Sequence, residues 1–190
     1  MAKRVYFAFH YQDVIDFRAN VVRKHNALTS AEQAGYFDAS IWEEAEKKGD
    51  LALKRMINSE LKNTSVTAVL IGSQTYARTW VRYEIFKSIE VGNFLLGIHI
   101  NSINGRDEKT KNKGPDPFAY CGLRISDDGS TGTPIVWKDN KWYYFSKLDG
   151  FSIRKQPEEY RGKNVKLSNW YPTYDWVANN GNLNFKDWIA

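Results

Sequence analysis

The chain has 190 residues, which is enough for one domain with a sizeable buried core. Hydrophobic residues make up 42% and charged residues 26%, a balance that is typical of globular proteins and excludes a disordered chain. The formal net charge is +5, but lysine and arginine are scattered, and their densest cluster, at residues 106–113, also holds two acids, so we expect no nucleic-acid partner.

The apolar segments are too short for a membrane protein. None approaches the roughly eighteen residues that a membrane-spanning helix needs. The apolar stretch after Lys3-Arg4 is also too brief for a secretory signal. Cys121 is the single cysteine, which excludes an intrachain disulfide. We therefore expect a cytoplasmic protein without a membrane partner.

The first hundred residues alternate between strand and helix patterns. Apolar, β-branched runs predict strands, and the run Val-Thr-Ala-Val-Leu-Ile at 66–71 is typical of a central strand buried on both faces. In chain order we predict a strand at 5–9, a helix at 12–24, a loop at 28–35, a weak strand at 36–37, a helix at 41–47, a helix with an apolar face over 53–61, the strand at 66–71, a helix at 80–91 and a strand at 94–100. This alternation predicts an α/β fold, an open parallel sheet with helices on both faces.

The pattern changes after residue 100. Residues 101–117 are polar and contain Asn-Gly and Gly-Pro pairs, which predict a long loop. Aromatic and β-branched runs on either side of Asp139-Asn140 predict a hairpin. We expect residues 146–170 to be irregular and two short helices at 174–178 and 185–189. The prediction is one domain over 1–190, with its core at about 1–118 and a C-terminal elaboration at about 119–190.

Ligands of open α/β sheets bind beyond the carboxyl ends of the strands. Three loops meet this condition, and they carry His10 and Tyr11, Asp38 and Ser40, and Ser73 followed by Trp80 and Glu84. Each residue also has a structural interpretation. Asp38 and Ser40 are suited to cap a helix, and Trp80 is suited to pack in the core. His10 and Tyr11 have ordinary loop polarity as their structural interpretation.

Several kinds of site are not predicted. The sequence has neither G-x-G-x-x-G nor G-K-[ST], so we expect no glycine-rich phosphate loop. His10, His25 and His99 lack metal-ligand spacing, and His99 lies within a predicted strand, where a hydrogen-bonded structural histidine is the simpler interpretation. We therefore expect no metal site.

Glu84 is the strongest candidate for a working carboxylate. It lies four residues after Trp80, so both side chains share one face of the helix that follows the buried strand and the Gly72-Ser73 turn. The alternative is an acid in the first helical turn that merely compensates the helix dipole.

The segment 66–85 resembles the strand-turn-helix segment of TIR domains, and Trp80 with Glu84 matches their Trp-x-x-x-Glu element. Residues 5–13 resemble the TIR opening, although His10 departs from its usual residues. The whole chain, including residues 37–40 and the tryptophan-rich tail, is similar to the TIR-like ThsB proteins of bacterial Thoeris antiphage defence.

This resemblance implies a flavodoxin-like, TIR-like fold and an enzyme that cleaves NAD, with NAD as substrate and no cofactor. It implies that nicotinamide is released and that a cyclic ADP-ribose-type signal activates a ThsA effector. It further suggests a phage-derived trigger and a homo-oligomer. Glu84 takes the place of the catalytic glutamate, and the expected substrate-binding residues are Phe9, His10, Tyr11, Asp38, Ser40, Ser73 and Trp80.

The chemistry of NAD cleavage can be performed with a single carboxylate. Cleavage of an N-glycosidic bond passes through an oxocarbenium-like ribose, and nicotinamide leaves as a neutral group. A single glutamate can hold the ribose hydroxyls and stabilise the positive charge. Three alternatives remain: a non-catalytic TIR scaffold, a nucleoside deoxyribosyltransferase-like enzyme with a glutamate nucleophile, and a basic nucleic-acid binder.

Overall fold

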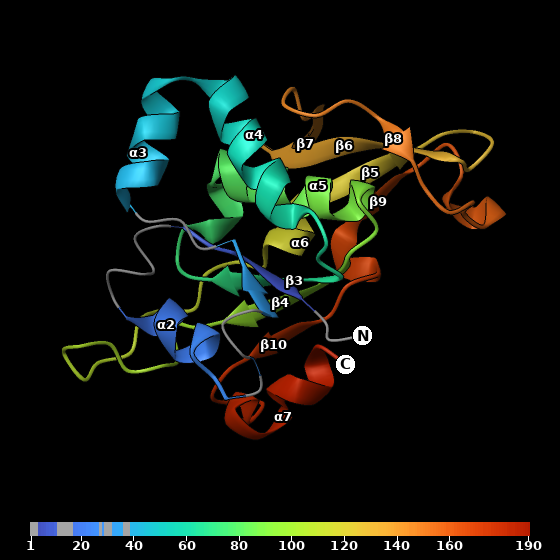
Figure 1. Cartoon of the computed structure of the whole chain (residues 1–190). Coiled ribbons are helices and arrows are strands. Elements are labelled where there is room, and N and C mark those ends of the chain that lie inside the picture. The colour runs from blue at the N-terminus through green and yellow to red at the C-terminus, as the bar shows by residue number, and fades with distance from the viewer. Residues whose placement is uncertain (1–3, 11–16, 27, 29–31, 36–38) are drawn as a thin grey trace.

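The computed structural model describes residues 4–10, 17–26, 28, 32–35 and 39–190, except the side chains of Ala39 and Ser40. A five-stranded parallel sheet forms its centre, with the strand order β2-β1-β3-β4-β10 (Figure 1). Its strands are β1 (Val5–Ala8), β2 (Gln33–Ala34), β3 (Val66–Ile71), β4 (Phe94–His99) and β10 (Thr173–Asp175). This is the flavodoxin-like order, and it confirms the predicted open parallel sheet.

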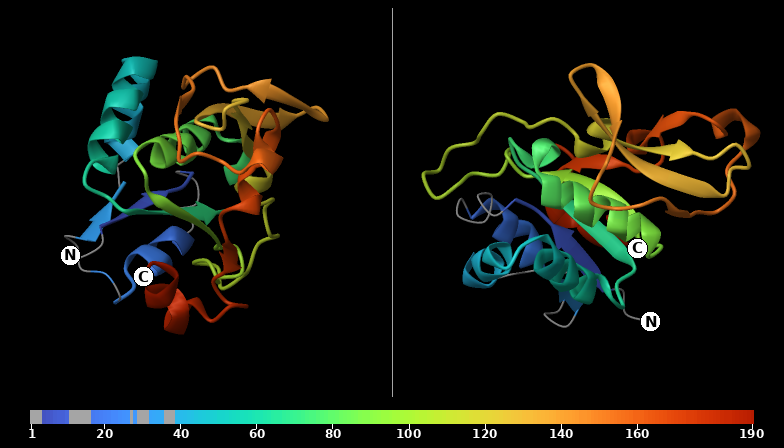
Figure 2. Two further views of the ribbon diagram at one scale, coloured as in Figure 1. Left: turned by 90° about the vertical axis from the view of Figure 1, so that its right-hand side faces the viewer. Right: turned by 90° about the horizontal axis from the view of Figure 1, so that it is seen from above.

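Helices cover both faces of this sheet because the strands are apolar on both faces. In β1, Tyr6 and Ala8 join one hydrophobic core, and Val5 and Phe7 join the other. The first core includes residues of α4 (Asp50–Leu61), α5 (Thr79–Glu90) and α6 (Pro117–Tyr120), and Trp42 of α3 (Ala39–Lys47) packs against it. The second includes residues of α2 (Arg18–Arg23) and α7 (Gly181–Trp188), and Figure 2 shows these helices on the opposite side of the sheet.

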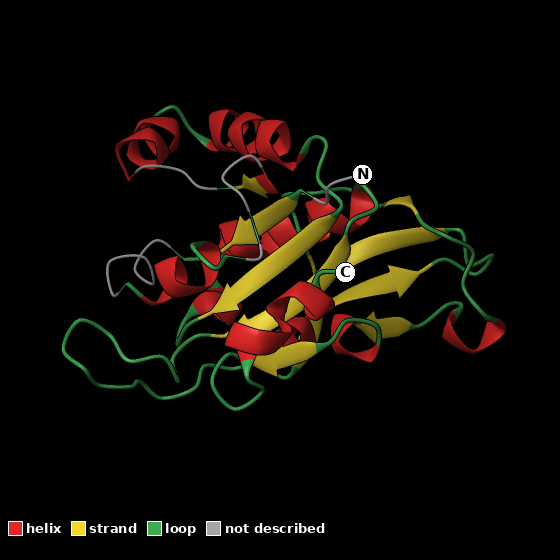
Figure 3. Ribbon diagram, turned by 60° about the horizontal axis from the view of Figure 1, so that its bottom comes forward, coloured by secondary structure: helices red, strands yellow, loops and turns green. Residues whose placement is uncertain are grey.

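A second, antiparallel sheet lies beyond α5 and α6 (Figure 3). Its strands are β5 (Cys121–Ile125), β6 (Thr131–Lys138), β7 (Lys141–Tyr144), β8 (Phe151–Ser152) and β9 (Asn164–Lys166). The rings of Phe86 in α5 and Phe145 after β7 have their centroids 5.2 Å apart, which joins this sheet to the first core. Single 3-10 turns are η2 (Thr75–Ala77), η3 (Glu158–Tyr160) and η4 (Leu167–Asn169).

The structure confirms the elements predicted from long apolar patterns. These are the strands at 66–71 and 94–100, the helices at 41–47, 53–61 and 80–91, and the hairpin around Asp139-Asn140. None of the helices in the described ranges combines the length and the apolar character needed to cross a membrane.

Three predictions differ from the structure, and two more fall partly or wholly outside the described residues. Residues 173–175 form strand β10, so a helix over 174–178 is wrong. The predicted loop at 28–35 contains β2, and the predicted irregular stretch at 146–170 contains β8 and β9. The helix predicted at 12–24 is described only from residue 17 onward, and there it forms α2. The weak strand predicted at 36–37 lies outside the described residues.

The C-terminal segment supplies the edge of the parallel sheet. β10 comes from residues expected to elaborate the domain, and it pairs with β4 through Thr173 and Gly97. A Cβ atom at Gly97 would lie 2.8 Å from Oγ1 of Thr173, so glycine allows this close approach. Such a pairing depends on a contact between distant residues, which is why the local pattern around residue 174 does not predict it.

Candidate active site

A cleft of about 390 Å³ opens beside the carboxyl end of β1, between the loop after β1, α3 and the start of α5. Strand order reverses between β1 and β3, and this switch point is where open α/β sheets bind ligands. The residues that line the cleft are Phe9, His10, Gly35, Trp42, Glu46, Ala77, Arg78, Thr79, Trp80, Val81 and Glu84.

Glu84 is the buried acid of this cleft. Its side chain lines the cavity, yet the residue is only 3% exposed. The hydroxyl of Tyr6 donates a hydrogen bond of 2.6 Å to its Oε1 atom. Burial raises the pKa of Glu84 to about 8, against the smaller lowering by the Tyr6 hydrogen bond.

The position of Glu84 in α5 excludes the helix-dipole interpretation. The helix begins at Thr79, and its first turn holds no acidic residue, so Glu84 lies in the second turn. The dipole acts mainly within the first turn of a helix. Glu84 therefore gains little from the dipole, and its burial in a cleft with a strongly raised pKa is typical of a functional carboxylate.

Trp80 lies between the cleft and the first core. Its ring lines the cleft, and it also packs against the first core, with its centroid 5.7 Å from that of Tyr83 in an edge-to-face arrangement. Nζ of Lys147 lies 5.4 Å from the centroid of the Trp80 ring and also pairs with Asp50. Trp80 thus contacts Tyr83 and Lys147 and also contributes to the lining of the cleft.

The loop after β1 contributes Phe9 and His10 to the cleft. Burial lowers the pKa of His10, and the positive charge of Arg78 lowers it further. Its imidazole is therefore neutral near pH 7 and able to accept or donate a hydrogen bond. Tyr11 and Asp38 lie outside the described residues, and Ser40 lies in the first turn of α3 with its side chain outside them.

Ser73 does not line this cleft. Its Oγ atom accepts a hydrogen bond of 2.8 Å from Nδ2 of Asn101, and it lies 3.5 Å from the backbone oxygen of Asn112. The structure thus places Ser73 against the loop that follows β4, whereas Phe9, His10, Trp80 and Glu84 line the cleft.

The sequence interpretation did not select the aromatic and charged lining residues Trp42, Glu46 and Arg78, nor Tyr6, the partner of Glu84. Trp42 and Glu46 face the cavity from α3, and Arg78 faces it from the residue before α5. Trp42 and Glu46 are four residues apart on a predicted helix, so the spacing could have indicated that both side chains lie on one helix face. Tyr6 could not be distinguished, because it lies in a uniformly apolar run and reads as a core residue.

The histidines form no metal centre within the described residues, where no group of three or more metal-ligating side chains lies together. His99 lies in β4 and is 5% exposed, and burial lowers its pKa to about 4, with the Lys113 charge acting in the same direction and Asp175 opposing it. Its Nδ1 atom has no hydrogen-bond partner among the described residues, so the expectation of a fully hydrogen-bonded histidine is wrong for that atom.

Comparison with known proteins relates this geometry to a family. Residues 6–104 match the family model described as "Thoeris protein ThsB, TIR-like domain". The chain belongs to the ThsB family. It is also 53% identical over 192 residues, covering 100% of both chains, to a protein of Bacillus cereus (strain MSX-D12) named "Putative cyclic ADP-D-ribose synthase ThsB1". The segment matched by the ThsB model contains every residue that lines the cleft.

Proposed function

We propose that this ThsB-family protein is an enzyme that cleaves NAD and converts the ADP-ribosyl part into a cyclic ADP-ribose-type product. The observation that carries this proposal is the buried Glu84 carboxyl group in the cleft at the switch point of the parallel sheet. The name of the Bacillus cereus relative, a cyclic ADP-D-ribose synthase, supports the same chemistry.

In the first step the bond between nicotinamide and C1′ of the ribose breaks, and nicotinamide departs as a neutral molecule with the bonding electrons. The carboxylate of Glu84 stabilises the positive charge that develops on the ribose. The raised pKa of Glu84 is compatible with this role, because the cationic nicotinamide ring of bound NAD favours the charged form of a neighbouring carboxyl group.

In the second step C1′ forms a bond to a nucleophilic atom of the adenosine end of the same molecule. If that atom carries a proton, it loses the proton as the bond forms. This ring closure requires the two ends of the substrate to be held together and water to be kept away. Trp42 and Trp80 give the cleft two aromatic surfaces from different helices, which suit the planar groups of NAD. NAD is the substrate here, and we propose neither a further cofactor nor a metal ion.

The proposed partners follow from the family. The product is a diffusible nucleotide signal for a ThsA effector in the cytoplasm. A phage-derived trigger and assembly into a homo-oligomer are further parts of the proposal.

The ionisation of Glu84 predicts how the rate depends on pH. The carboxylate is the active form and its pKa is about 8 in the free protein, so kcat/KM for NAD should rise as pH increases through this region. Steady-state nicotinamide release between pH 5 and 10 measures this profile. An acidic limb near pH 4 to 5, the range of an ordinary glutamate, would contradict the assignment.

Substrate and product identify the function directly. The purified full-length protein is incubated with NAD, alone and with lysate of phage-infected bacteria, and nicotinamide and nucleotides are followed by chromatography and mass spectrometry. We expect nicotinamide together with a cyclic ADP-ribose-type product. Absence of both in every condition would overturn the proposal. Turnover in a parallel incubation with deoxynucleosides, and none with NAD, would support the deoxyribosyltransferase-like alternative.

A further inference from the structure

The hydroxyl group of Tyr6 is the hydrogen-bond donor at the base of the cleft. Tyr6 belongs to β1 and is fully buried, and its hydroxyl oxygen lies 2.6 Å from Oε1 of Glu84 in α5. This distance is that of a short hydrogen bond to a carboxylate, which is stronger than a bond between neutral groups. The bond joins a central strand to the helix that carries the candidate catalytic acid.

The ring of Tyr6 has little freedom to move. β1 lies between β2 and β3, and Tyr6 pairs with Ala34 of β2 on one side and with Thr67 of β3 on the other. Gly35 packs on the ring so closely that a Cβ atom there would lie 2.8 Å from Cε2 of Tyr6. Gly35 also has φ of +79°, so a larger residue would be strained at this position. The Tyr6 hydroxyl is thus held at a fixed point of the fold.

We propose that Tyr6 is a positioning residue that fixes the orientation of the Glu84 carboxyl group in the cleft. Among the described residues Tyr6 is the hydrogen-bond partner of this side chain, and it engages Oε1. Oε2 is then left for a ribose hydroxyl or for the developing positive charge. The catalytic consequence rests on the proposed function, whereas the fixed orientation does not.

Tyr6 also affects the charge of Glu84. Burial favours the neutral acid, and the Tyr6 hydrogen bond opposes burial by stabilising the carboxylate. The pKa of Tyr6 itself is raised well above its usual value, by burial and then by Glu84 and Glu60, so the hydroxyl keeps its proton and remains a donor. Among the described residues, the other ionisable groups that line the cleft are His10 after β1, Glu46 on α3 and Arg78 before α5.

The substitution Tyr6→Phe removes this hydroxyl and leaves the ring in place. Tyr83→Phe is the matched control, because Tyr83 is also buried at 2% exposure and its hydroxyl donates to Asn58 at 3.1 Å, away from Glu84. The carboxyl ¹³C resonance of Glu84, assigned with Glu84→Gln, is titrated in each protein. We expect the midpoint of the Glu84 titration, near pH 8 in the wild type, to move upward by about one to two pH units in Tyr6→Phe. In Tyr83→Phe we expect the midpoint to remain unchanged.

The same variants separate positioning from a change of charge alone. In Tyr6→Phe we expect kcat for NAD to fall by about ten- to a hundredfold with little change in KM. The deficit should persist above the pH at which Glu84 is ionised, because the carboxylate is then charged but not oriented. Full recovery of kcat at high pH, or an equal loss in Tyr83→Phe, would overturn the positioning role.

A measurement on the protein with Tyr6 in place covers the case in which Tyr6→Phe does not fold. Above pH 8, where Glu84 is ionised, the hydroxyl proton of Tyr6 should resonate downfield in the NMR spectrum and move upfield in Glu84→Gln, since a neutral amide is a weaker acceptor than a carboxylate. An unchanged Tyr6 resonance in Glu84→Gln would overturn the proposal. If the Glu84 titration responds to Tyr6→Phe but no NAD is cleaved, the proposed function fails and the positioning contact stands.

Discussion

At the scale of single residues, the carboxyl group of Glu84 is buried, and burial disfavours its ionised form. The residue is 3% exposed, and Tyr6 gives it one hydrogen bond. Burying a carboxylate costs free energy unless it is well compensated. The free protein therefore favours the protonated acid, and a bound cation such as the nicotinamide ring would release the proton.

This arrangement predicts that Glu84 lowers stability as pH rises. Its pKa is raised from 4.5 to about 8 in the folded protein, so between these values the native state binds more protons than the unfolded state. The free energy of unfolding then decreases with pH in this window. Glu84→Gln cannot lose a proton, so its stability relative to the wild type should grow from pH 4.5 to pH 8 by about 3–5 kcal/mol.

Urea unfolding of both proteins at pH 5, 7 and 9 measures this difference. Glu90→Gln, on the same helix but in an ion pair with Lys87 at 2.6 Å, is the control. A constant difference between Glu84→Gln and the wild type across the three pH values would show that the raised pKa is wrong.

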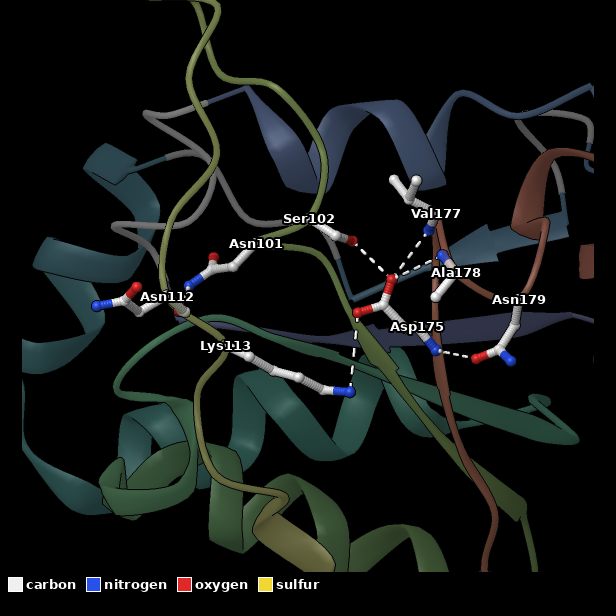
Figure 4. A network of polar contacts seen from close by, with 8 residues as sticks. All are labelled: Asn101, Ser102, Asn112, Lys113, Asp175, Val177, Ala178 and Asn179. Carbon is white, nitrogen blue, oxygen red and sulfur yellow. Dashed lines mark hydrogen bonds and ion pairs between the residues drawn. The ribbon is translucent and has the colours of Figure 1, made fainter.

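At the scale of elements, the long loop after β4 is held in place by a polar network. Oδ1 of Asp175 in β10 accepts hydrogen bonds from Ser102 at 2.8 Å and from the N–H groups of Val177 and Ala178 (Figure 4). Nζ of Lys113, near the other end of the loop, lies 3.8 Å from Oδ2. The loop is thus tied to β10 at both ends.

The loop has further attachments to the body. Nε of Arg18 in α2 donates to the backbone oxygen of Ile103 at 2.9 Å, and Nδ2 of Asn101 donates to Oγ of Ser73 at 2.8 Å. None of the loop residues, all of which are described, lines the cleft. The predicted loop is therefore confirmed, but in this conformation it does not cover the candidate site.

Asp175→Asn tests the network. Burial raises the pKa of Asp175, but the hydrogen bonds from Ala178, Ser102 and Val177 and the charge of Lys113 together hold it below its usual value. This carboxylate thus contributes stability above its unfolded pKa and loses it as pH falls. We expect the substitution to reduce the free energy of unfolding by about 1–3 kcal/mol at pH 7, because it removes charge-assisted bonds.

Thermal and urea unfolding measure this loss, and hydrogen exchange of the loop amides reports where it arises. Asp149→Asn, at an exposed position, is the control and should be near neutral. Equal stability of Asp175→Asn and the wild type, with unchanged protection of the loop, would contradict the attachment described here.

At the scale of the whole molecule, the sequence predicted the parts whose pattern is local and long. The uniformly apolar run at 66–71 became the central strand, and the helix predicted at 80–91 became α5 with Trp80 and Glu84 in one cleft. β10 was missed because it is three residues long and contains polar side chains. Its pairing with β4 depends on residues far apart in the chain, which propensity does not report.

The candidate site shows the same limit. Phe9, His10, Trp80 and Glu84 were predicted from recognisable motifs, whereas Trp42 and Glu46 reach the cleft because the fold brings α3 to the same cavity as the start of α5. Tyr6 was hidden because a buried tyrosine in a strand reads as core until the partner of its hydroxyl is known.

Removing the chain after Tyr171 tests whether the C-terminal segment belongs to the folding unit. The truncation deletes β10 and α7, and with them Trp176, Phe185 and Ile189 from the second core. Because one face of the parallel sheet would keep α2 but lose α7 and three core residues, we expect no cooperative unfolding transition in urea. Leu183→Ala, at a position 77% exposed on α7, is the control and should unfold cooperatively. A truncated chain with a sharp transition would contradict this role.

The central claim, that Glu84 performs the cleavage of NAD, is tested most directly by the rate of nicotinamide release from Glu84→Gln. The substitution keeps the size and the acceptor for Tyr6 but removes the negative charge. Under the condition in which the wild type is active, we predict a loss of at least about a hundredfold in kcat for Glu84→Gln and near wild-type rates for Glu90→Gln on the same helix. Full activity of Glu84→Gln would contradict the claim.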